Sequence, residues 1–96
     1  MTEAVRAALA ARGVACCTPV GGILEATRIF ETAAFAYLRM HRGGGREGRF
    51  TTRELRLWAE RIREVEERGR DVYVYFNNDW RGFAVTNAAE LRELVA

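Results

Sequence analysis

The segment AFAYLRMH, residues 34–41, is an almost continuous apolar run that ends in polar side chains. Such runs are typical of strands buried on both faces, as in a parallel sheet. Arg39 and His41 then come at the carboxyl end of the strand. The segment DVYVYFNND, residues 71–79, repeats this pattern, because a β-branched and aromatic run there ends in Asn77, Asn78 and Asp79.

Helical patterns separate and follow these two strands. Thr51 and Glu54 have the spacing of a capping box, and an apolar stripe leads from them to Gly69. The stripe consists of Leu55, Trp58, Ala59, Ile62 and Val65. The opposite face is charged, and pairs spaced i,i+4 explain it as a solvated face. A last helix is expected from Phe83 to Val95. Strands that alternate with helices predict right-handed crossovers and a parallel α/β sheet.

The N-terminal part predicts one more helix and one more strand. Thr2 is a suitable N-cap, and Gly13 suits the left-handed turn that ends a helix. The residues from Val14 to Thr18 are short and apolar, so they predict a strand that ends before Pro19. The stretch 23–32 approximates a helical face but is too short to assign. The loop RGGGREGR, residues 42–49, lacks the Gly-Lys-Ser/Thr ending of a P-loop, which favours a flexible connection over a nucleotide cradle.

Length, composition and charge limit the classes of protein that fit. The 96 residues suffice for one domain but not for a complete (β/α)₈ barrel of about 250 residues. A net charge of +2 argues against the basic field that dominates nucleic-acid affinity, although the arginines at 42, 46 and 49 leave a weakly supported local contact open. No apolar run is long enough to span a membrane, and the N-terminus lacks a signal-peptide pattern, so a cytoplasmic protein is expected.

Functional groups in parallel α/β proteins collect where strands end, so the two polar strand ends are expected to lie side by side. Arg39 could hold an anionic group, His41 could act as a general acid or base, and Asp79 could orient His41. Asn77 and Asn78 offer neutral amides for polar substrate atoms. Each of these asparagines could also simply form a turn, but the two clusters together favour a functional site.

Several other chemistries find no support in the sequence. The chain contains no Ser, and His41 is its only His, so a Ser nucleophile and paired-His metal ligation are excluded. No convincing set of metal ligands is present, and no cofactor can be assigned. Cys16 and Cys17 would point to opposite faces of a strand, which does not favour a disulfide between them. Whether the chain is an enzyme stays open.

Four segments together resemble the C-terminal part of the YecE-like family, also named domain of unknown function 72. They are AFAYLRMH, FTTRELRLWAERI, DVYVYFNND and GFAVTNAAEL, and the resemblance is continuous from about residue 34 to residue 94. It implies a partial TIM-barrel-like fold of (β/α) units, with residues 1–96 as a single truncated YecE-like domain. The residues that match the family's polar pattern are Arg39, His41, Phe76, Asn77, Asn78, Asp79 and Asn87. The chain departs from the family pattern at Arg42, where Gly is usual, and at Phe50, where Tyr is usual.

The sequence therefore leaves more than one function open. One is a strand-end polar site for an anionic or phosphate-bearing ligand, with His41 and Asp79 as catalytic residues and Arg39, Asn77, Asn78 and Asn87 as ligand-binding residues. The alternatives are a non-catalytic interaction module and an inactive fragment of a barrel protein. Apolar strands with open edges recruit other chains, so self-association, or a chain that supplies the missing strands, is expected.

Overall fold

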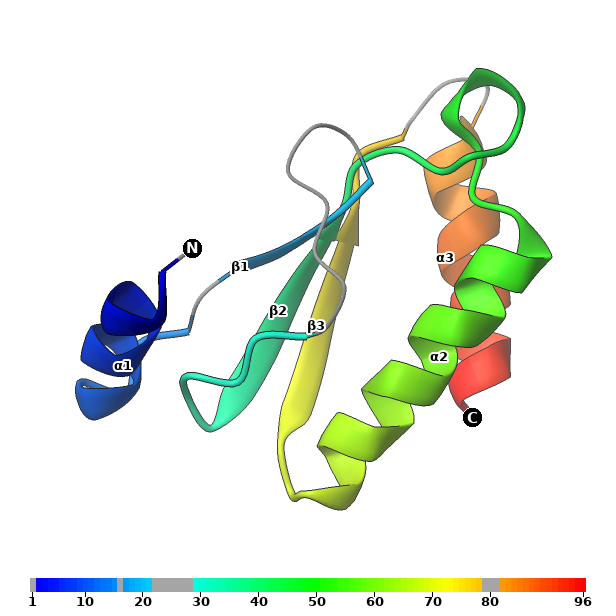
Figure 1. Ribbon diagram of the computed structural model, residues 1–96. Helices are drawn as coiled ribbons and strands as arrows, with labels where there is room; N and C mark the ends of the chain where they lie inside the picture. The colour runs from blue at the N-terminus through cyan, green and yellow to red at the C-terminus, as the bar shows by residue number, and fades with distance from the viewer. Residues whose placement is uncertain (1, 16, 22–28, 79–81) are drawn as a thin grey trace.

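The computed structural model describes residues 2–15, 17–21, 29–78 and 82–96. Helices and strands alternate along most of this chain (Figure 1). In order they are α1 (Glu3–Ala11), β1 (Cys17–Val20), β2 (Phe35–Met40), the 3₁₀ turn η1 (Arg46–Gly48), α2 (Thr52–Glu67), β3 (Asp71–Phe76) and α3 (Phe83–Val95).

The three strands form one parallel sheet in the order β1-β2-β3. The register of β2 with β3 runs from the pair Phe35 and Asp71 to the pair Met40 and Phe76. Since β2 is central, the described part of the chain leaves β1 and β3 as edge strands. The predicted α/β fold with parallel strands and intervening helices is thus confirmed.

Side chains of the strands alternate between two faces of very different exposure. One face, which we call the helix face, packs against α2 and α3 and forms the core together with their apolar residues. The helix face consists of Thr18, Val20, Ala36, Leu38, Met40, Val72, Val74 and Phe76. The other, which we call the open face, consists of Cys17, Pro19, Phe35, Tyr37, Arg39, Asp71, Tyr73 and Tyr75.

The prediction that these strands are buried on both faces is wrong for the chain as described. Along β2, Ala36 and Leu38 are fully buried, whereas Phe35 and Arg39 are exposed. The same alternation holds for β3. The reason is that α2 and α3 cover only one side of the sheet, so among the described residues no layer lies over the alternate side chains.

The first strand also begins and ends later than predicted, at Cys17 and Val20 instead of Val14 and Thr18. The Val14 amide donates to Leu9 O at 2.9 Å and so belongs to the end of α1. Val20 O accepts from the His41 amide at 2.8 Å, so the backbone groups of the preceding Pro19 point away from β2. Proline is tolerated there because its missing N–H lies on the free edge.

Helix α2 has the predicted start and the predicted buried stripe. The Glu54 amide donates to Thr51 Oγ1 at 3.2 Å, and the Thr51 amide donates to the Glu54 carboxylate at 2.8 Å, which completes the capping box. Trp58 is only 4% exposed, and the Arg61 guanidinium lies 4.5 Å from the centre of its ring. The buried stripe that includes Trp58 packs α2 against the helix face.

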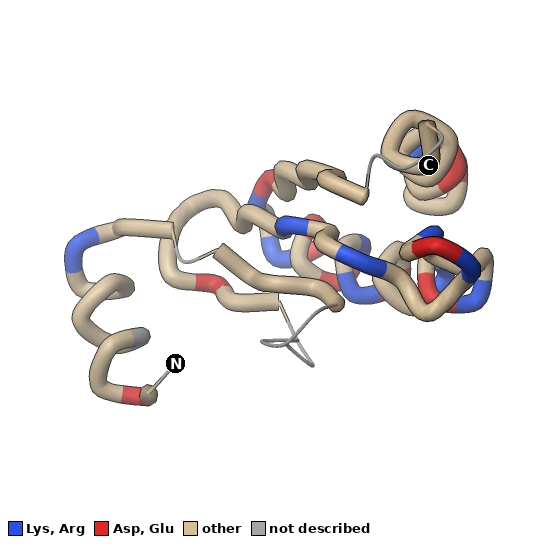
Figure 2. Tube along the Cα trace, turned by 90° about the horizontal axis from the view of Figure 1, so that it is seen from above, with Lys and Arg blue, Asp and Glu red and all other residues tan. Residues whose placement is uncertain are grey.

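Helix α1 begins at the predicted cap, where the Val5 amide donates to Thr2 Oγ1 at 3.2 Å. It ends at Gly13, whose φ of 65° is the left-handed conformation expected of a terminating glycine. Seen from above, α1 and the pair α2 and α3 lie at opposite ends of the molecule (Figure 2). The largest extent of the chain is accordingly 40 Å, against 17 Å for the smallest.

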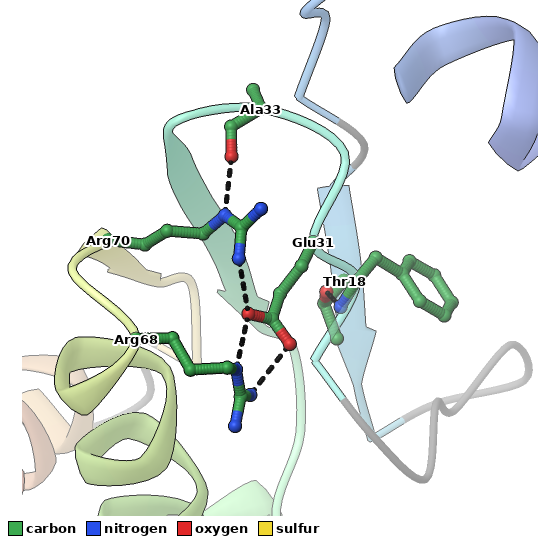
Figure 3. Close-up of polar contacts among 6 residues, drawn as sticks. Thr18, Glu31, Ala33, Arg68 and Arg70 are labelled. Atoms are coloured by element: carbon green, nitrogen blue, oxygen red, sulfur yellow. Dashed lines mark hydrogen bonds and ion pairs between the residues drawn. The ribbon is translucent and has the colours of Figure 1, made fainter. Parts of the chain in front are cut away.

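An ion-pair network joins the loop before β2 to the loop before β3, at the amino ends of these strands (Figure 3). The Glu31 carboxylate accepts from Arg68 Nε at 2.9 Å and Arg68 Nη2 at 2.7 Å, and Arg70 Nη1 donates to it at 3.1 Å. Arg70 Nε also donates to Ala33 O at 2.9 Å. The hydrogen bonds from Arg68 and the charges of Arg68 and Arg70 lower the pKa of Glu31 below its ordinary value of 4.5.

Replacing Glu31 should reveal this network through the pH dependence of stability. Because the pKa of Glu31 is lowered on folding, its contribution is complete above pH 4.5 and disappears as the pH falls through the lowered pKa. We expect Glu31→Gln to melt at a lower temperature than the unaltered chain at pH 7, with the difference shrinking in acid. Thermal melts followed by circular dichroism measure this, with the exposed Glu60→Gln on α2 as control. A Glu31→Gln deficit that persists unchanged in acid would contradict the ion-pair explanation.

Candidate functional site

The backbone pairing of β1 with β2 and of β2 with β3 continues one residue beyond the strands. The Asn77 amide donates to Met40 O at 3.1 Å, and the His41 amide donates to Val20 O at 2.8 Å. Because side chains alternate and Met40 and Phe76 belong to the helix face, His41 and Asn77 extend the open face. The two side chains meet, with Asn77 Nδ2 at 3.4 Å from His41 Nδ1.

The contact between Asn77 and His41 bears on the tautomer of the imidazole. The amide nitrogen is a donor, so this contact fits the tautomer in which His41 Nδ1 accepts and Nε2 carries the proton. His41 is half-buried and Asn77 is exposed, so solvent reaches this pair.

Arg39 and Tyr75 lie one step back along the same strands, paired in register on the open face. The Arg39 side chain is exposed and Tyr75 is 53% exposed. We call Arg39, His41, Tyr75 and Asn77 the strand-end cluster. The cluster brings together a guanidinium, an imidazole, a phenol and an amide, and all four can donate hydrogen bonds to oxygen atoms.

Sequence reasoning identified Arg39, His41 and Asn77 but missed Tyr75. The signal was present, because Tyr75 precedes Asn77 by two residues and strand alternation puts both on one face. Asp79, predicted as a catalytic partner of His41, lies outside the described residues. The catalytic assignment of His41 and Asp79 therefore stays a prediction.

Asn78 and Asn87 occupy a different place, on the helix side of the sheet. Asn78 is 7% exposed, and its Nδ2 donates to Gly48 O at 3.2 Å and to Asn87 Oδ1 at 2.8 Å. Asn87 is 1% exposed, and its amide accepts from Phe50 N at 2.9 Å and donates to Phe50 O at 3.1 Å. These side chains join α3, the end of β3 and the loop before α2, apart from the strand-end cluster. No hydrogen bond joins Asn78 or Asn87 to the strand-end cluster in the described part of the chain. Their ligand-binding role therefore stays a prediction.

The Gly-rich loop at residues 42–49, predicted to be a flexible connection, forms backbone hydrogen bonds within itself. The Gly43 amide donates to Gly48 O, and the Gly45 amide donates to Arg49 O, both at 2.9 Å. A Cβ at Gly43 would come within 2.4 Å of Arg49 O, so this close approach requires glycine. The Gly44 amide donates to both Glu54 carboxylate oxygens at 3.0 Å. The Glu54 carboxylate thus ties the loop to the first turn of α2.

Two further searches of the described residues returned negative findings. Among residues 2–15, 17–21, 29–78 and 82–96, no group of three or more His, Cys, Asp or Glu side chains could hold a metal ion. In that same part of the chain, the helices all fall short of the length and apolar character that crossing a membrane requires.

Removing the Asn87 amide should destabilise the fold. In Asn87→Ala the N–H and C=O of Phe50 and the Asn78 amide lose their buried partner, and an unsatisfied buried polar group costs about 1–3 kcal/mol. We expect the free energy of unfolding in urea to fall by at least about 2 kcal/mol. Thr86→Ala, at the exposed neighbouring position, is the control and should change little. Equal stability of the two variants would show that the Asn87 contacts do not hold the loop.

The model of one protein family, described as "Protein of unknown function DUF72", matches this chain over residues 1–96. No curated protein and no solved structure matches it. The matched span covers every strand and helix described above, including the strand-end cluster and the Asn87 network. This chain therefore belongs to the family of proteins of unknown function DUF72.

Proposed function

We propose that the strand-end cluster binds a ligand through a phosphate or carboxylate group. The observation that carries the proposal is the exposed Arg39 guanidinium, which lies on the same sheet face as the contacting pair His41 and Asn77. A guanidinium donates two parallel hydrogen bonds to the oxygens of such an anion. Among the described residues, Arg39 has no carboxylate partner within ion-pair distance, so its donors are available.

The neighbours of Arg39 supply the further contacts that an oxyanion needs. The Tyr75 hydroxyl and the Asn77 amide are neutral donors, so they hold oxygen atoms without a second fixed charge, and the His41 imidazole adds a ring N–H donor. The exposed arginines of the adjacent loop, at positions 42, 46 and 49, raise the local concentration of anions. An acid or base role for His41, oriented by Asp79, would add proton transfer to binding.

The larger setting of this site is also part of the proposal. In the described part of the chain, the parallel (β/α) units leave two strand edges and one sheet face uncovered, and this supports a YecE-like TIM barrel of which the chain forms part. The strand-end cluster would then lie at the carboxyl end of the barrel strands, where sites in such barrels are built. An interaction module is the second candidate function, and the exposed aromatic side chains of the open face favour it.

An NMR titration with inorganic phosphate tests the ligand proposal. We expect the amide signals of His41, Asn77 and their neighbours to shift as phosphate is added. Arg39→Met should weaken binding about tenfold to a hundredfold, because a hydrogen bond to a charged group contributes about 1.5–3 kcal/mol. Arg56→Met, which removes an exposed guanidinium from α2, is the matched control and should bind as the unaltered chain does.

Two results of this titration would overturn the proposal. One is equal phosphate affinity of Arg39→Met and Arg56→Met. The other is a set of shifts confined to the loop at residues 42–49, which would place the anion on the loop arginines instead of the cluster. Circular dichroism of each variant confirms that the comparison is between folded chains.

A further inference from the structure

Tyr75, a member of the strand-end cluster, presents an aromatic ring that is accessible to a ligand. Its side chain is 53% exposed, and in the described part of the chain neither a second aromatic ring nor a cation lies against it. Other rings are paired. Those of Phe35 and Tyr73 meet edge to face at 5.6 Å, and those of Phe50 and Phe76 do so at 5.8 Å.

The register of the sheet places this ring beside the cation of the cluster. Arg39 pairs with Tyr75 on one side and with Pro19 on the other, and all three belong to the open face. Neighbouring strands lie about 4.8 Å apart, so the guanidinium and the phenol ring project from the sheet as neighbours. The ring of Pro19 is aliphatic and half-buried. An anion on Arg39 therefore has an aromatic surface on the Tyr75 side.

We propose that the ligand of the strand-end cluster carries a planar aromatic ring joined to its anionic group, and that this ring stacks on Tyr75. The inference rests on the proposed function, because Arg39 holds the anionic group. An offset stack uses the face of the Tyr75 ring, and the hydroxyl at the edge of that ring stays available as a donor. The ligand is then an aryl phosphate or an aromatic carboxylate rather than free phosphate.

The proposed barrel setting agrees with a small ligand at this place. The open face would be the inner face of the barrel, and side chains fill most of such an interior. The paired rings of Phe35 and Tyr73 lie toward the amino ends of the strands, where they would belong to this filling. Tyr75 lies toward the carboxyl end, where barrel sites bind their ligands.

NMR titrations with inorganic phosphate, cyclohexyl phosphate and phenyl phosphate test the inference. Inorganic phosphate reports the anion contact alone. The two esters carry rings of similar size on the same phosphate group, but only the phenyl ring is aromatic. We expect phenyl phosphate to bind about threefold to tenfold more tightly than cyclohexyl phosphate, since aromatic pairs gain this much beyond the burial of their area.

Two substitutions of Tyr75 separate the ring from its hydroxyl. Tyr75→Leu removes the aromatic face, so the two esters should then bind equally. Tyr75→Phe keeps the face and removes one donor, so it should weaken all three ligands and retain the preference for phenyl phosphate. Tyr73→Leu, at an exposed position of the same strand and face, is the matched control and should also retain the preference. Circular dichroism confirms that each variant is folded.

The outcomes distinguish this inference from the proposed function. Equal affinity of the unaltered chain for the two esters, or a preference that survives Tyr75→Leu, overturns the inference. Inorganic phosphate binding that depends on Arg39 would in that case leave the proposed function in place. A preference that Tyr75→Leu abolishes, with affinities that Arg39→Met does not change, supports the stacking contact and overturns the proposed function. Absence of binding by all three ligands overturns both.

Discussion

The burial of alternate side chains along β2 is the constraint on which the rest of the structure depends. Ala36, Leu38 and Met40 are fully buried against the helices, so the register of the central strand cannot slip by one residue without exposing all of them. Both neighbouring strands take their register from β2. The same alternation sends Arg39 and His41 to the open face. The packing of the core thus decides which polar side chains can meet at the strand ends.

The two ends of the sheet have separate roles. At the amino ends, Glu31 joins the loops before β2 and β3 through ion pairs that hold the strands in place. At the carboxyl ends, the hydrogen-bond donors of the strand-end cluster are accessible to solvent. This division is common in (β/α) proteins, where one end of the sheet maintains stability and the other carries chemistry. A change that weakens the Glu31 network would therefore act on stability without touching the proposed ligand site.

Most of the elements could be predicted from the sequence, because capping residues, apolar periodicity and glycines are local signals. The shift of β1 could not, since it depends on which backbone groups of Pro19 face β2, and that is settled by the pairing with residues far along the chain. For the same reason Asn78 and Asn87 looked like strand-end and helix polar residues of the site. Asn87 is buried against Phe50 and Asn78 against Asn87 because of how α3 docks, which no local pattern reveals. Tyr75, in contrast, was predictable from the sequence, because the alternation of side chains along the strands places it on the same sheet face as Arg39.

The way Asn87 holds Phe50 has a consequence for how the fold is built. Its side-chain amide accepts from the N–H and donates to the C=O of a single residue, as the peptide groups of an adjacent strand do. Helix α3 thereby gives Phe50, in the segment before α2, the two hydrogen bonds that a neighbouring strand would give it. One side chain on α3 thus satisfies both backbone polar groups of Phe50 and holds the segment before α2 against α3.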